Sequence, residues 1–115
     1  MGSYADDALF MSRNNIEYVE LISDDGKSKV MVIPAWQGRV MTTSAAGDEG
    51  DSYGWINYSF IKKRQIDLQF NPVGGEERFW LGPEGGVFSL YFRQGEKQIY
   101  KNWKVPPVLD IEACL

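Results

Sequence analysis

The sequence predicts an all-β fold, an antiparallel β-sandwich with at most one short helix. Short segments with apolar residues at strand spacing recur along the chain, and turns rich in glycine and proline separate them. No internal repeat, low-complexity tract or linker divides the sequence. Its 115 residues, 43% of them hydrophobic, are enough for one such domain and few for two.

The beginning of the chain is predicted to lie outside the core of this domain. Residues 1–15 are polar, small and weakly patterned, with residues 9–11 as their only apolar cluster. Chain ends are poorly ordered unless contacts tie them down. We therefore expect a mobile or edge segment over residues 1–15, followed by a single β-sandwich domain over residues 16–115.

The first elements of the domain are predicted to form a hairpin. Apolar residues recur through residues 16–23 as in a half-buried strand, and residues 24–26 supply a turn in which Gly26 takes positive φ. Residues 29–33 alternate less, as in a more fully buried strand. Pro34 ends this second strand because proline has no backbone N–H to donate.

A third strand and the one short helix follow. Residues 38–44 alternate between two faces, as strands do. Residues 55–63 carry apolar side chains at a spacing of three residues, which predicts a short helix. The side chains at that spacing are Trp55, Tyr58 and Ile61.

Three further strands are predicted in the second half of the chain. The first covers residues 66–70, and the other two form a hairpin of residues 87–92 and residues 98–105. The turn of this hairpin contains glycine at residues 94–96, and the prolines at residues 106–107 stop the last strand.

The segment from Gly74 to Gly86 is the most concentrated motif of the sequence. It surrounds the aromatic pair Phe79 and Trp80 with glycines, a proline, an arginine and three carboxylates. Glycine allows positive φ and close approach of backbones, so the motif predicts a rigid binding loop or a tight corner of a sheet.

Four segments in order carry a resemblance to a known family. They are residues 37–42, 53–57, 74–86 and 102–106. Together they resemble an uncharacterised bacterial family related to the galactose mutarotase (aldose 1-epimerase) β-sandwich proteins. Members of that wider group are sugar-binding supersandwiches, and full-length relatives are considerably longer. The resemblance therefore implies the N-terminal portion of such a fold.

The resemblance implies a ligand class but no reaction. Mutarotases take their acid and base from histidine and a late glutamate, whereas this chain has no histidine and ends before that glutamate. We expect a non-catalytic carbohydrate-binding module. The alternatives are the N-terminal fragment of a sugar-active enzyme whose catalytic residues lie outside this chain, and a structural or protein-interaction domain.

Aromatic side chains with nearby polar groups are the expected ligand contacts, because sugars place C–H faces on rings and hydroxyls on polar side chains. The alternative is that the aromatic residues are core material and that Arg78 pairs with the glutamates beside it. Other aromatic side chains that could contact a sugar are Trp36, Trp103, Tyr53, Tyr58 and Tyr91. The expected ligand-binding residues are Arg39, Trp55, Arg78, Trp80 and Glu84.

Charge and hydropathy exclude two classes of partner. The 12 basic and 16 acidic residues are mixed along the chain and give a net charge of −4, so no basic stripe is present to bind nucleic acid. No apolar run approaches the roughly 18 residues that predict a membrane-spanning helix. We expect a soluble bacterial protein, cytoplasmic or, if a signal peptide was removed, exported.

No metal site and no cofactor are expected. Asp48, Glu49 and Asp51 offer oxygen ligands in a glycine-containing loop, but the spacing of a calcium-binding EF-hand is absent. The single cysteine, Cys114, has no basic neighbour that would activate its thiol.

A homodimer is the expected assembly. Part of a sandwich leaves strand edges without partners, and such edges pair readily with another strand. Symmetric pairing of two copies would complete the sheets.

Overall fold

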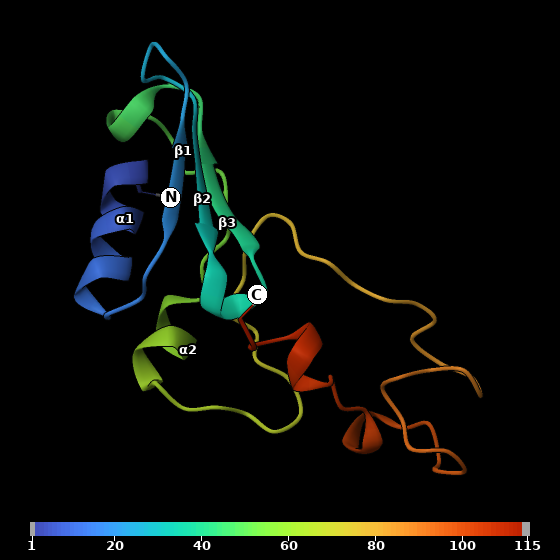
Figure 1. The fold of residues 1–115 in the computed structure, drawn as a ribbon. Helices are drawn as coiled ribbons and strands as arrows, with labels where there is room; N and C mark the ends of the chain where they lie inside the picture. Colours follow the sequence, from blue (N-terminus) through green and yellow to red (C-terminus); the bar gives the residue numbers. More distant parts are fainter. Residues whose placement is uncertain (1, 114–115) are drawn as a thin grey trace.

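A three-stranded antiparallel sheet with two α-helices forms the ordered centre of the computed structural model, which describes residues 2–113 (Figure 1). Strand β2 lies between β1 and β3. Both helices lie on the same side of the sheet (Figure 1). The elements are α1 (Tyr4–Arg13), β1 (Val19–Ile22), β2 (Lys29–Ile33), β3 (Arg39–Ser44) and α2 (Tyr58–Lys63). Short 3-10 turns lie at Pro34–Trp36, Gly47–Glu49, Tyr100–Asn102 and Pro107–Leu109.

The predicted hairpin, third strand and short helix are confirmed. The backbone N–H of Ser23 donates to the carbonyl of Ser28 at 2.9 Å and closes the turn between β1 and β2, where Gly26 has φ +74°. β2 pairs with β3 through a register shift between Met31 and Val32. Such a shift is a β-bulge or a similar irregularity, which bends the strand locally.

The first residues of the chain form helix α1 instead of a mobile or edge segment. The Ser3 hydroxyl accepts from the Asp6 backbone N–H, and the Asp6 carboxylate accepts from the Ser3 N–H, both at 3.2 Å. This capping box satisfies two N–H groups at the helix start. Tyr4 and Met11 are fully buried on the face that α1 turns to the sheet. The prediction missed these contacts because they come from distant segments.

The first apolar core fills the space between the sheet and both helices. The phenol of Tyr4 donates to the Glu20 carboxylate at 2.9 Å, and the phenol of Tyr58 donates to Asp7. Burial and the neighbouring carboxylate raise the pKa of Tyr4, and the same two causes raise the pKa of Tyr58 to about 12. The buried members of this core are Tyr4, Met11, Met31, Ile33, Met41, Ile56, Ile61 and Val73.

The second sheet that a sandwich requires is not formed within residues 2–113. The predicted strands at residues 66–70, 87–92 and 98–105 run as turns and irregular backbone. In place of a second sheet, isolated bridges pair Val40 with Glu77 and Ile56 with Gly74. The fold is therefore a small, β-rich mixed one in which the sandwich is not confirmed. Its two α-helices exceed the expected limit of one.

The second half of the chain, drawn from yellow to red in Figure 1, extends away from the sheet. We call this part the second lobe. The radius of gyration is 16.1 Å and the molecule measures 53 × 27 × 27 Å. A compact domain of this length has a radius of gyration of about 13 Å. A second apolar cluster stabilises this lobe around buried Tyr91, Val105 and Leu109. Among the described residues, no helix has the length and apolar character needed to cross a bilayer.

Strand β1 leaves one sheet edge without a strand partner in the described part of the chain. Its side chains Val19, Leu21 and Ile22 are about half exposed, at 49%, 58% and 51%. The homodimer through unpaired edges stays a prediction, and light scattering coupled to gel filtration checks it. We expect the mass of two chains at micromolar concentration, and Leu21→Lys is expected to shift it to one, because charge on an edge opposes strand pairing. A wild-type monomer would contradict the prediction.

Candidate functional site

A buried ionic cluster connects the sheet to the second lobe. Asp110 is 1% exposed, and its Oδ1 lies 3.7 Å from Arg39 Nη2 and 3.5 Å from Arg78 Nη2. Its Oδ2 accepts hydrogen bonds from the backbone and side-chain nitrogens of Asn71 at 2.8 and 3.0 Å. One carboxylate therefore faces two guanidinium groups contributed by different parts of the chain.

Arg39 is part of the interior and not of a surface site. The residue is 2% exposed and its Nη1 donates to the carbonyl of Gly74 at 2.8 Å. Burial lowers the pKa of Arg39 to about 10, and the nearby charge of Arg78 acts in the same direction. Burial also lowers the pKa of Arg78. The structure thus places Arg39 in the interior, where its guanidinium group connects β3 to Gly74 and Asp110.

Aromatic rings from three segments stack behind Arg78 and form what we call the aromatic column. The Arg78 guanidinium lies 4.5 Å from the ring centre of Trp80, which is stacked on Tyr91 at 4.9 Å and 11°. Tyr91 lies 6.1 Å from Trp103, and Trp103 lies 6.1 Å from Tyr100. The rings of the aromatic column are Trp80, Tyr91, Trp103 and Tyr100.

Three of the predicted site residues lie together and contact one another. They are Arg78, Trp80 and Glu84. The indole N–H of Trp80 donates to the Glu84 carboxylate at 2.8 Å, while Arg78 covers the Trp80 ring. Arg78 also donates to the carbonyl of Leu109. Within the Gly74–Gly86 motif, the indole N–H of Trp80 and the guanidinium of Arg78 are thus engaged by protein groups.

Trp55 lies apart from these three residues. Its backbone carbonyl accepts from the N–H of Gly75 at 2.7 Å, and its ring packs beside Gly74. The side chain is 63% exposed. The structure does not place Trp55 in the aromatic column or in the cavity beside it.

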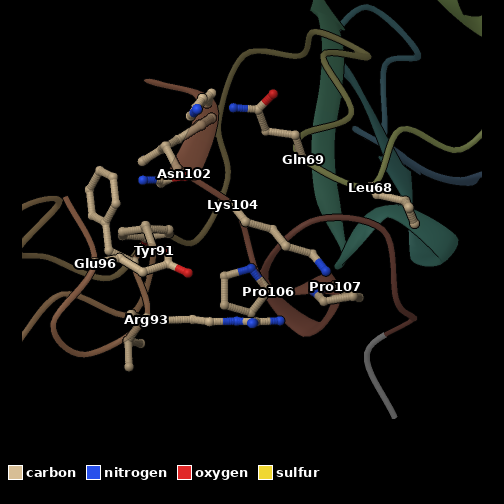
Figure 2. A pocket seen from close by; sticks show the side chains of 13 residues that line it. Leu68, Gln69, Tyr91, Arg93, Glu96, Asn102, Lys104, Pro106 and Pro107 are labelled. Carbon is tan, nitrogen blue, oxygen red and sulfur yellow. The ribbon is translucent and has the colours of Figure 1, made fainter. Parts of the chain in front are cut away.

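An open cavity of about 510 Å³ lies beside the aromatic column (Figure 2). One part of its lining is apolar, and half-buried Trp103 belongs to it. The exposed side chains Leu68 and Leu90, at 79% and 54%, extend this surface. The apolar and aromatic lining consists of Leu68, Leu90, Tyr91, Phe92, Trp103, Pro106 and Pro107.

Polar side chains from separate segments line the same cavity. The side-chain nitrogen of Gln69 donates to the carbonyl of Tyr100 at 2.5 Å, and that of Asn102 donates to the carbonyl of Lys97 at 2.8 Å. These bonds fix both amides, and within residues 2–113 their side-chain oxygens accept no hydrogen bond. The polar lining consists of Gln69, Arg93, Glu96, Lys101, Asn102 and Lys104.

A second hollow is smaller and less polar. It has a volume of about 250 Å³ and lies between Trp36 and the end of α2. Within residues 2–113, no group of three or more His, Cys, Asp or Glu side chains is placed to hold a metal ion. Asp48, which belongs to the acidic loop, pairs with Lys29 at 2.5 Å. Cys114 lies outside the described residues.

The sequence reasoning named Tyr91 and Trp103 among the aromatic candidates but missed the polar lining of the cavity. The missed residues had a visible pattern, since Lys101 and Lys104 flank the Asn102–Trp103 pair. Asp110 was also missed, although an acidic residue within the apolar run of residues 108–111 indicates a buried partner.

One comparison with known proteins identifies a family. Residues 2–114 match a family of unknown function, DUF6786. No curated protein and no solved structure matches the sequence. Because the match extends over nearly the whole chain, this protein belongs to the DUF6786 family of unknown function.

Proposed function

We propose that this protein binds carbohydrate in the cavity beside the aromatic column, without catalysing a reaction on it. The cavity volume of about 510 Å³ lies within the range of about 300–1,000 Å³ that is usual for small-molecule sites. The resemblance of the Gly74–Gly86 motif to mutarotase-like proteins favours a sugar over other ligands. The absence of histidine from the sequence favours binding over acid-base catalysis.

The observation that carries this proposal is the combination of half-buried Trp103 with two oriented amides in one cavity. An apolar surface of this kind suits the C–H face of a pyranose ring. The side-chain oxygens of Gln69 and Asn102 suit its hydroxyl groups, since their amide nitrogens are already engaged. The proposed orientation is therefore ring against Trp103 and hydroxyls toward the amides.

Isothermal titration calorimetry against a panel of neutral and acidic mono- and oligosaccharides tests the proposal. We expect measurable binding by the wild-type protein and at least about tenfold weaker binding by Trp103→Ala, equivalent to about 1.4 kcal/mol. Trp55→Ala is the matched control, because it removes an exposed tryptophan outside the cavity. That variant is expected to bind as the wild type does.

A second variant separates loss of contact from loss of folding. Trp103 also packs on Tyr91 and Phe70, so its removal can loosen the lobe. Leu68→Asp changes a cavity residue that is 79% exposed and is expected to leave the fold intact, as circular dichroism would show. It is expected to weaken sugar binding. The proposal fails if no sugar binds the wild type, or if Trp103→Ala and Leu68→Asp both retain wild-type affinity.

A further inference from the structure

The lining of the cavity beside the aromatic column has a net positive charge, whereas the whole chain has a net negative charge. Its lining contains three of the chain's 12 basic residues but one of its 16 acidic residues. The whole chain has a net charge of −4. The basic members are Arg93, Lys101 and Lys104, and the acidic member is Glu96. The local excess of two positive charges thus opposes the overall charge of the molecule.

The basic side chains of the lining are free to meet a ligand. Arg93, Lys101 and Lys104 are all exposed. The ion pairs found within residues 2–113 involve Lys29, Arg39 and Arg78 and none of these three. In Figure 2 the side chains of Arg93 and Lys104 extend past Pro106 in the same direction. Two cationic side chains thus line the cavity, and neither forms an ion pair with a carboxylate of residues 2–113.

We propose that the saccharide held in this cavity is acidic and carries a carboxylate or phosphate group that Arg93 and Lys104 bind. This inference rests on the proposed carbohydrate function and names the class of sugar. Guanidinium groups match carboxylate and phosphate oxygens with two parallel hydrogen bonds, and an ammonium group adds a mobile point charge. Lys101, on the same lining, adds long-range attraction, while Glu96 lowers it.

The arrangement assigns different parts of one ligand to different parts of the lining. The ring lies against Trp103, the hydroxyls meet the amides of Gln69 and Asn102, and the anionic substituent meets Arg93 and Lys104. Neutral sugars retain the first two sets of contacts and lose the third. A preference for acidic over neutral sugars is therefore the property that this inference adds.

A matched pair of ligands tests the preference by calorimetry on the wild-type protein. The pair is a uronic acid oligosaccharide and the neutral oligosaccharide obtained by reducing its carboxyl groups. We expect the acidic form to bind at least about tenfold more tightly at low salt, and the advantage to shrink as NaCl is raised, because salt screens exposed charges. A hexose phosphate beside the free hexose shows whether phosphate serves as well as carboxylate.

The double variant Arg93→Gln with Lys104→Gln tests whether these two side chains cause the preference for acidic sugars. It is expected to bind the acidic and the neutral oligosaccharide with equal affinity. The control is Lys97→Gln, which removes an exposed lysine of the same lobe outside the cavity lining. This control is expected to keep the preference, and both variants are expected to keep the wild-type circular dichroism.

The outcomes distinguish this inference from the function on which it rests. If the wild type binds acidic and neutral sugars equally, or if the double variant keeps the preference, the acidic-sugar inference is wrong while carbohydrate binding stands. If neither sugar of either pair binds the wild type, both are wrong. A preference for one anionic group over the other identifies which substituent the cavity takes.

Discussion

Replacing Asp110 with alanine is expected to lower the free energy of unfolding by about 3–5 kcal/mol. The substitution leaves Arg39 and Arg78 with no carboxylate beside them, and Arg39 is 2% exposed. It also removes the acceptor of two hydrogen bonds from Asn71. Removing one partner of a buried ion pair costs this much because the remaining charge has lost both water and counter-charge. Chemical denaturation followed by circular dichroism measures the change.

The control for this experiment is Glu112→Ala, two residues further along the chain. Glu112 is exposed, and its side chain forms no ion pair among the described residues. Its removal is expected to change the free energy of unfolding by no more than about 0.5 kcal/mol. Equal effects of Asp110→Ala and Glu112→Ala would show that the cluster does not hold the two halves together.

Gly74→Ala is expected to destabilise the protein for two reasons that add. Gly74 has φ +96°, which costs a residue with a side chain about 1–3 kcal/mol. A Cβ at this position would also lie 2.2 Å from the carbonyl oxygen of Trp55, so the backbone of one segment must move. Overpacking of this kind costs about 1–3 kcal/mol more. The free energy of unfolding from denaturant titration gives the sum.

Gly86→Ala measures the cost of the backbone conformation without the cost of close packing. Gly86 has a similar φ of +91°, but a Cβ there would meet no atom within 4 Å. It is expected to cost about 1–3 kcal/mol, from the backbone conformation alone. The difference between the two variants therefore measures the close approach of Gly74 to Trp55. If Gly86→Ala lowered the free energy of unfolding as much as Gly74→Ala, the close approach of Gly74 to Trp55 would not contribute to the loss of stability.

The candidate site could be predicted from the sequence only in its residue types. The cavity lining contains aromatic rings with polar neighbours, and Tyr91 and Trp103 were among the candidates. Which rings share a site depends on contacts between segments far apart in the chain, such as Trp80 on Tyr91 and Tyr91 on Trp103. No local pattern distinguishes Trp55, which lies elsewhere, from Trp103.

The sequence alone determined the local elements of this protein. The β1–β2 hairpin, strand β3 and helix α2 follow from alternation, a glycine turn and apolar residues at helical spacing, all of which act between near neighbours. The tertiary structure decided the rest. Burial of Tyr4 and Met11 holds α1, and Asp110 determines that Arg39 faces the interior. Burial and charge pairing depend on which distant segments meet, and that information is spread over the whole chain.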